Sequence, residues 1–157
     1  MFLIGVAIAL GRLDEGAAWA ECAEVALART GENAALRTRL DNHRGHLAAA
    51  RGDLAAAAEW HQQAVARDVL TRGPDHPFLV VSLLDLGEVL LRAGDVAGAR
   101  DAAVRAGAIV DVDSNQPTRS RARCLDLLAA LARHDGRSAD ADLLSARATG
   151  IRERLSR

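Results

Sequence analysis

Hydrophobic positions between residues 78 and 106 recur at three- and four-residue steps, which is the period of a helix with one buried face. Leu86 and Leu90 lie on one such face, and Gly94, followed by an aspartate, interrupts it. The period resumes in residues 96–106, where alanines take most of the apolar positions. This stretch therefore predicts a helical hairpin in which leucines fill the space between two closely spaced helices.

The same unit recurs along the whole chain. Its marker is the glycine in the turn of each hairpin, and successive markers are 41, 42 and 42 residues apart, at Gly11, Gly52, Gly94 and Gly136. Small residues stand five positions after the markers, at Gly16, Ala57, Ala99 and Ala141. Alanine stands twelve positions after them, at Ala23, Ala64, Ala106 and Ala148. Small side chains at constant offsets favour close helix crossings, so we predict an all-α fold, an α-solenoid of about four antiparallel helical hairpins.

The period also predicts where the units begin. Within a single repeat domain of residues 1–157, the units span approximately 1–31, 32–73, 74–115 and 116–157. Asn33 is expected to cap the first helix of the second unit. In the third unit Asp75 or His76 is expected to cap a helix with Pro77 in its first turn, and Pro117 is expected to open the first helix of the fourth.

This pattern resembles the tetratricopeptide repeat, whose characteristic positions are matched in order by Leu86-Gly87, Gly94, Val96, Ala99 and Ala106 in the third unit. The resemblance covers essentially the whole chain, although standard units of that family are about 34 residues long. The linker RGPDHP at residues 72–77 resembles the connector of the long-repeat, kinesin-light-chain-like branch, which is common in bacterial signalling proteins. HEAT and armadillo repeats share the period and are the alternative fold, but they do not place small residues at these offsets.

Composition supports helix and limits the classes of partner. Hydrophobic residues make up 50% of the chain and aromatic residues only 3%, with three prolines and no tyrosine. Twenty basic and 21 acidic residues give a formal net charge of -1, so no general field draws the chain to nucleic acid or to an anionic membrane. We therefore expect neither a nucleic-acid nor a membrane partner.

Cysteine usage and the first ten residues bear on the cellular location. Cys22 and Cys124 form no CxxC motif, and both are expected to be small buried side chains. Residues 1–10 are apolar, but they lack a basic flank and are too short to span a bilayer. These features predict a cytoplasmic protein.

The histidines indicate metal chemistry only weakly. His43 and His46 are one helical turn apart, and Asp41 and His61 are near them in sequence. This spacing differs from that of HExxH and no cysteine is close, so a pair of solvated histidines is the favoured interpretation. No metal site is predicted.

Other candidates for chemistry have structural explanations. Asp75 and His76 fit a capping role in a turn better than acid–base catalysis. No GxGxxG or GxxxxGK[ST] motif supports nucleotide binding. Trp19 and Trp60 occupy equivalent positions in two units and are expected to pack in the core or between repeats. We therefore predict no catalytic residue, no cofactor and no enzyme activity.

The resemblance implies a non-catalytic protein–protein interaction scaffold, in which the first helix of each hairpin lines a concave groove for a peptide or a partner helix. The candidate groove residues that it assigns, with flanking arginines, are Arg39, Asn42, His46, Leu84, Glu88, Leu91, Arg92, Arg123, Asp126 and Arg133. Arginines outnumber acidic residues in this set, so partners with acidic residues flanking apolar anchors are expected. Leu84 and Leu91 are expected to receive the anchors.

Two other functions stay open. The first helix is shorter than its counterparts, so the chain is expected to begin inside a longer repeat array. One alternative is therefore the regulatory or docking segment of a larger bacterial signalling protein such as a serine/threonine kinase, although no Gly-rich loop, HRD or DFG motif is present. The other is a self-associating adaptor, because a helix that packs on one side cannot bury all the apolar side chains of residues 2–8, which predicts a homodimer through this end.

Overall fold

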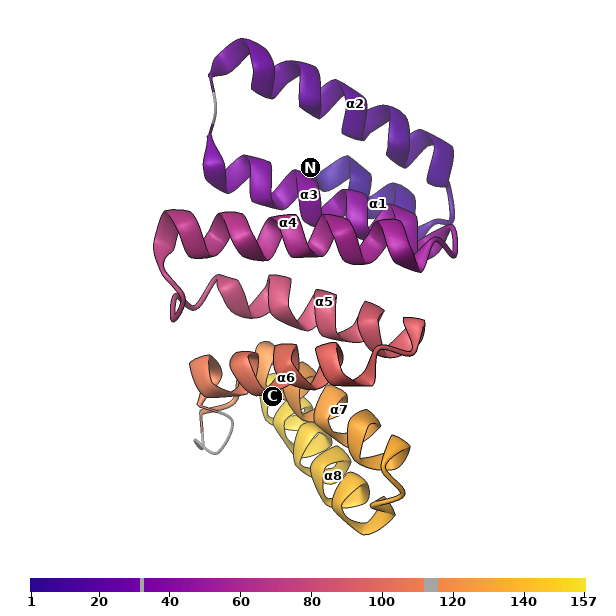
Figure 1. Cartoon of the computed structure of the whole chain (residues 1–157), viewed down its shortest axis with the longest axis vertical. Coiled ribbons are helices and arrows are strands. Elements are labelled where there is room, and N and C mark those ends of the chain that lie inside the picture. The colour runs from indigo at the N-terminus through magenta and orange to yellow at the C-terminus, as the bar shows by residue number, and fades with distance from the viewer. Residues whose placement is uncertain (32, 112–115) are drawn as a thin grey trace. The chain divides into compact units, whose positions relative to one another are not determined.

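The computed structural model describes residues 1–31, 33–111 and 116–157, and within them every regular element is an α-helix. The described helices are α1 (Phe2–Ala9), α2 (Leu13–Thr30), α3 (Ala34–Ala50), α4 (Leu54–Arg72), α5 (Leu79–Ala93), α6 (Val96–Val110), α7 (Arg119–His134) and α8 (Ser138–Leu155) (Figure 1). The predicted all-α class and the α-solenoid of helical hairpins are confirmed.

The chain forms two compact units, residues 1–74 and 75–157. In the first unit α1 pairs with α2 and α3 with α4, and in the second unit α5 pairs with α6 and α7 with α8. The helix α3 also packs on α1 and α2, and α7 packs on α5 and α6, so consecutive hairpins stack inside each unit. The division between the units lies next to the predicted boundary between the second and third repeats. The grouping of all four repeats into one domain stays a prediction.

The marker glycines close the four hairpins. Their backbones are in the left-handed region, with φ values of 70°, 84°, 87° and 76° at Gly11, Gly52, Gly94 and Gly136. After α5 the turn is completed by hydrogen bonds from Gly94 N to Leu91 O (3.1 Å) and from Asp95 N to Leu90 O (2.9 Å). Residues with a β-carbon are strained in this conformation, so glycine is strongly preferred at the turn. The sequence period is therefore the spacing of these turns.

Side-chain caps decide where several helices begin. Asn33 caps α3 as predicted, because its Oδ1 accepts a hydrogen bond from Leu36 N at 3.1 Å. The predicted start of α7 at Pro117 is wrong. Thr118 Oγ1 accepts a hydrogen bond from a backbone N–H three residues further on, at 3.1 Å, so Thr118 is the cap and the helix begins at Arg119.

The predicted capping of α5 is also wrong. This helix begins at Leu79, its N-cap residue is Phe78, and no side chain caps it. His76 Nδ1 instead accepts a hydrogen bond from Phe78 N at 3.2 Å, one residue before the helix. The imidazole therefore organises the turn that leads into α5, and Asp75 is exposed.

Small residues bring the helices of the second unit close together. A β-carbon at Gly87 on α5 would lie 2.7 Å from Leu127 Cδ2 and 3.4 Å from the Ala99 carbonyl oxygen. Ala99 and Ala106 on α6 are completely buried. Only a missing side chain at Gly87 allows α5 to approach both α6 and α7 to this distance. The predicted role of these small residues is confirmed.

In the first unit a glycine likewise allows α3 and α4 to approach closely. A β-carbon at Gly45 would lie 2.5 Å from Nε2 of His61, and this imidazole is completely buried. Aliphatic side chains fill the core between the first three helices: Ile4, Ala20, Leu27, Leu40 and Leu47. The Gly45 backbone and the His61 ring therefore form a close helix contact beside an aliphatic core.

The short helix α1 buries only part of its apolar surface. Ile4 is 0% exposed, whereas Phe2 and Leu3 are 81% and 48% exposed, and Leu10, directly after the helix, is 64% exposed. With eight residues, α1 is less than half as long as α2, which has 18. Within the described ranges, no helix is both long enough and apolar enough to cross a membrane.

Two predicted burials are wrong, and both residues are on α2. Cys22 is exposed and Trp19 is 41% exposed, so both lie on a face of α2 that its neighbours leave uncovered. Cys124 is buried as predicted, with Sγ 3.6 Å from Ala103 O. Burial raises the pKa of the Cys124 thiol to about 11, so this cysteine stays protonated and unreactive at neutral pH.

The contact between Gly45 and His61 predicts opposite effects of two glycine-to-alanine changes. Gly45→Ala should lower the free energy of unfolding by about 1–3 kcal/mol, because the new methyl group overlaps a buried ring. Gly150→Ala is the matched control, since nothing lies within 4 Å of a β-carbon at this position inside α8. The control should raise the free energy of unfolding by about 0.5–1 kcal/mol, as expected for alanine in a helix. Urea denaturation measures both, and a stabilising Gly45→Ala would contradict the packing.

Candidate interaction surfaces on the first helices of the repeats

Three predicted groove residues lie together on α3. Arg39, Asn42 and His46 follow one another at helical spacing; Arg39 is exposed, and Asn42 and His46 are half-buried. Arg39 forms no ion pair among the described residues. The Asn42 side chain is held by α4, because its Oδ1 lies 3.1 Å from Nδ1 of His61. This face of α3 is therefore polar, with the exposed cation Arg39 beside two half-buried side chains.

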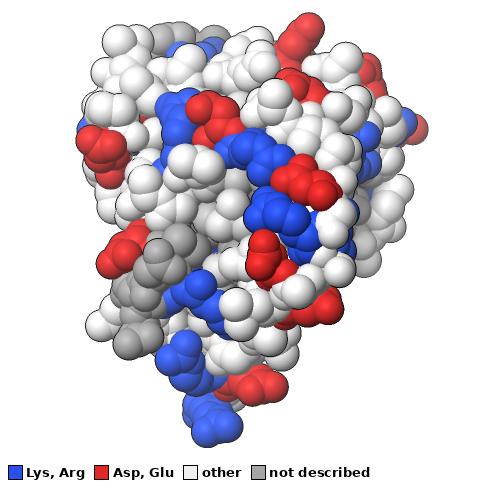
Figure 2. All heavy atoms as spheres, turned by 60° about the horizontal axis from the view of Figure 1, so that its bottom comes forward, with Lys and Arg blue, Asp and Glu red and all other residues white. Residues whose placement is uncertain are grey.

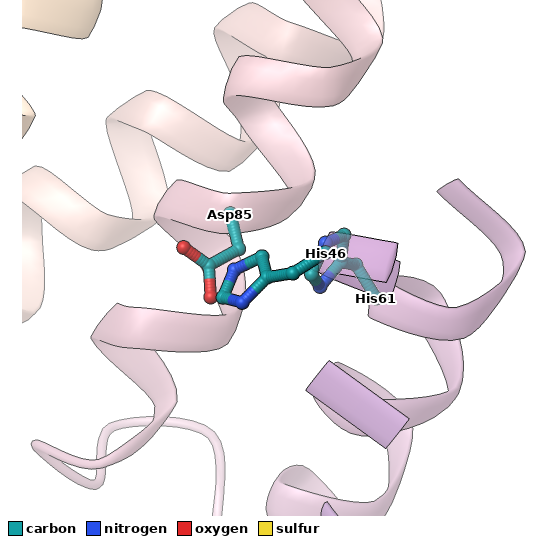
Figure 3. A group of neighbouring side chains, drawn as sticks. All are labelled: His46, His61 and Asp85. Atoms are coloured by element: carbon teal, nitrogen blue, oxygen red, sulfur yellow. The ribbon is translucent and has the colours of Figure 1, made fainter. Parts of the chain in front are cut away.

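The histidines are arranged differently from the predicted solvated pair. The ring centroids of His46 and His61 are 5.1 Å apart, and Figure 3 shows these two imidazoles side by side, one from α3 and one from α4. His43 is half-buried and its ring meets that of His46 edge-on, at 6.3 Å between centroids. The closer partner of His46 is thus on another helix, and these two rings are the side chains of the first unit best suited to hold a metal ion.

A buried carboxylate joins α3 to α4 beside this face. Asp41 is 1% exposed, and its Oδ2 accepts a hydrogen bond from Arg67 Nε at 3.2 Å. Burial raises the pKa of the Asp41 carboxyl above its ordinary value, and the Arg67 guanidinium offsets part of this effect. Relative to the unfolded chain, folding shifts the Asp41 carboxyl towards its protonated form, and the stability that this shift contributes falls as the pH rises through the folded pKa.

A second charge cluster joins α2 to α3. Glu24 accepts hydrogen bonds from Arg37 Nη1 at 2.6 Å and from Arg44 Nη1 at 2.8 Å. The hydrogen bond from Arg37 is the main cause that lowers the pKa of the Glu24 carboxyl, while burial opposes it. The guanidinium of Arg44 also lies 4.9 Å from the centroid of the Trp60 ring, within cation–π distance. These contacts between hairpins cannot be read from the repeat period.

The same helices enclose a hollow that the sequence did not predict. Its volume is about 290 Å³, and it is lined by Ala17, Ala20, Glu21, Arg44, Leu47, Ala48, Arg51, Asp53, Ala56 and Trp60. Its two cations are already neutralised, because Arg44 lies 3.5 Å from Glu21 and Arg51 lies 2.8 Å from Asp14. Of the residues considered in the sequence analysis, Trp60 lies in the wall of this hollow, where it is half-buried. Its walls offer no net charge for recognition.

In the second unit the predicted cation Arg123 bridges two helices. From α7 its Nη2 lies 2.7 Å from Asp85 Oδ1 and 2.7 Å from Glu88 Oε1, both on α5. Burial alone would lower the pKa of the Arg123 guanidinium, but the two carboxylates outweigh it and raise the pKa above its ordinary value. The side chain is therefore committed to joining the first helices of two repeats.

The other predicted residues of α7 are also engaged within the second unit. Asp126 pairs with Arg152 of α8, and Arg133 Nη2 donates a hydrogen bond to Ser145 Oγ at 2.7 Å. In Figure 2 acidic and basic side chains are interspersed over the visible face of the molecule. The charges that the sequence assigned to a groove on α7 are thus largely balanced by neighbouring side chains.

On α5 the two predicted anchor positions differ. Leu84 is 0% exposed, so its side chain does not reach the surface. Leu91 is half-buried and Arg92 is exposed, near the end of the helix. Of the two leucines, only Leu91 presents apolar surface to a partner.

The comparisons with known proteins concern the repeat and the fold. Residues 35–111 match the family profile described as tetratricopeptide repeat. A crystal structure of putative kinesin light chain nearly identical TPR-like repeats from Podosopora anserina superposes with a TM-score of 0.77 and 21% identity, over 97% of this chain and 72% of that one. A variant of those repeats gives the same TM-score and identity over 99% and 74%. At this identity the likeness shows the fold alone. No curated protein sequence matches the chain.

The Glu24 cluster predicts an acid-dependent loss of stability. Because its pKa is lowered from 4.5 in the folded state, the stabilisation from the Glu24 pair is present above that pH and is lost as the pH falls through the folded pKa. Glu24→Gln should therefore be less stable than the wild type at pH 7 and converge on it as the pH falls below the folded pKa of Glu24. The exposed Glu59 of α4, which forms no ion pair in the described part of the chain, provides the control Glu59→Gln. Urea denaturation at several pH values measures the difference, and a gap between wild type and Glu24→Gln that does not depend on pH would contradict it.

Proposed function

Because the chain is a tetratricopeptide repeat protein, we propose that it is a non-catalytic scaffold that holds a peptide or a partner helix on the first helices of its repeats. Tetratricopeptide repeats generally mediate protein–protein interactions, and their fold is typically a non-catalytic interaction scaffold. The observation that carries the proposal is the polar face of α3, where Arg39, Asn42 and His46 lie in line, with Arg39 exposed and the other two half-buried. The signalling context and the cytoplasmic location stay predictions.

The α3 face suits an extended peptide. Asn42 is held by its hydrogen bond to His61, so the amide loses little conformational freedom when a ligand binds. Arg39 lies one helical turn before it and offers an exposed guanidinium. A carboxylate on the partner would pair with Arg39 while the peptide backbone runs past Asn42. In the first unit this supports a partner with an acidic residue.

In the second unit the structure supports a more limited version of the predicted groove. Leu91 and Arg92 offer an apolar contact and a charge at the end of α5. Arg123 is already paired with two carboxylates, so it adds little attraction for an acidic partner. The proposed preference for acidic residues beside an apolar anchor therefore depends on the charge of Arg39 in the first unit and on the apolar surface of Leu91 in the second.

The α3 face predicts a charge-dependent loss of peptide affinity. A displayed library of random peptides should yield ligands enriched in Asp or Glu, and Arg39→Ala should weaken the best of them by roughly two- to fivefold, the size of an exposed ion pair. Arg29→Ala is the matched control, because Arg29 is an exposed arginine on α2 of the same unit. Calorimetry at low and high salt should show the difference shrinking as salt rises. Ligands without acidic enrichment, or equal losses in both variants, would contradict the proposed face.

We infer in addition that the chain self-associates through α1. The exposed apolar side chains of Phe2, Leu3 and Val6 support this, since they are contiguous on one short helix and are 81%, 48% and 38% exposed. A second copy of α1 would cover this surface with an equivalent one, as a two-fold symmetric contact requires.

Self-association predicts a concentration-dependent mass. Sedimentation velocity should show a monomer–dimer equilibrium, and Leu3→Glu with Val6→Glu should abolish the dimer, because the contact would bury unpaired charges. Leu70→Glu is the control, since Leu70 on α4 is 86% exposed and lies outside α1. A monomer at every concentration, or a dimer that survives the double substitution, would contradict this inference.

A further inference from the structure

We propose that His46 and His61 form a binding site for a divalent transition-metal ion, with zinc as the ion best suited to it. This site adjoins the proposed peptide contact at Arg39, shares His46 and Asn42 with the α3 face, and gives the first unit a second ligand class. The proposal rests on the geometry of three side chains in the α3–α4 hairpin: His46, His61 and Asn42.

The two imidazoles are close enough to share an ion. A ring nitrogen of His46 and a ring nitrogen of His61 lie within 4.8 Å of each other. Zinc–nitrogen bonds of about 2.0–2.1 Å place two nitrogen ligands of one tetrahedral ion about 3.4 Å apart. Binding therefore requires the half-buried His46 ring to move towards His61, while the buried His61 ring keeps its place against Gly45.

Asn42 prepares His61 to be a ligand. Asn42 Oδ1 can only accept a hydrogen bond, so the contact of 3.1 Å places the proton of His61 on Nδ1. The lone pair is then on Nε2, the tautomer that metal-binding histidines adopt when a carbonyl holds their other nitrogen. The fixed ring loses little freedom when the ion binds.

The donor set selects the class of ion. Imidazole nitrogen is a good ligand for zinc, copper and nickel, whereas magnesium and calcium require oxygen ligands. Two histidines from the first unit leave further coordination positions to water. An ion held in this way joins α3 to α4, and a ligand that binds only the folded state raises its stability.

The test is zinc titration of the full chain by calorimetry, together with thermal unfolding in the presence and absence of zinc chloride. We expect close to one ion per chain, a higher melting temperature with zinc, and no change with magnesium. His46→Gln should lower the zinc affinity at least about tenfold, and Asn42→Ala should lower it about tenfold through the orientation of His61. His46 is chosen over His61 because it is half-buried and its replacement leaves the contact with Gly45 intact.

Two control variants separate this site from other histidines. His43→Gln, one turn earlier on the same helix, and the exposed His134→Gln should each bind zinc within about twofold of the wild type. A wild-type chain that binds no zinc would overturn the proposal. It would also be overturned if His43→Gln or His134→Gln lost as much affinity as His46→Gln, or if His46→Gln bound as tightly as the wild type.

Discussion

The close approach of neighbouring helices is the constraint on which each unit depends. Two of these contacts form where one helix presents a glycine to a large side chain of the next, as Gly45 does to His61 and Gly87 does to Leu127. A methyl group at either position would lie well inside van der Waals contact. The alanines opposite Gly87 extend this contact along α6. Helix spacing in both units is thus set by the smallest side chains, and the leucines fill the volume that remains.

Charged side chains add a second layer of contacts between hairpins. In the first unit Glu24 on α2 accepts hydrogen bonds from two arginines of α3. In the second unit Arg123 on α7 forms ion pairs with two carboxylates of α5. These groups stack one repeat on the next, since the pairs join helices of different hairpins. Because these charged side chains already have partners inside the unit, they contribute little to the binding of a ligand. The recognition that we propose therefore depends on charges outside such pairs, of which Arg39 is an example.

The contact between α3 and α4 shows how packing and chemistry become linked. The absence of a side chain at Gly45 lets the His61 ring lie against α3, and this position brings the ring beside Asn42 and His46. A residue required for packing thus places nitrogen donors from two helices close together. The half-buried His46 connects that interior arrangement to the surface on which Asn42 and Arg39 lie.

The sequence alone determined the class and the period of this protein. Turn glycines such as Gly94, and small residues such as Gly87, follow local rules of backbone conformation and helix crossing, so their spacing could be read directly and their roles are confirmed. Capping by Asn33 was equally local, whereas the start of α7 was missed because Thr118 caps the helix more effectively than the proline before it. Local patterns of three to five residues thus account for most of the predicted fold.

The tertiary structure decided which of the candidate residues are available. Leu84 and Arg123 occupy the repeat positions of half-buried Asn42 and exposed Arg39. Leu84 is nevertheless completely buried, and Arg123 is held by two carboxylates from α5. His46 was paired in sequence with His43, but its closer neighbour is His61, fifteen residues further on and on another helix. Such pairings join side chains that a helical period cannot relate, because they depend on how the faces of two helices meet. The repeat pattern predicted the helices, and only their packing determined which side chains meet and which reach the surface.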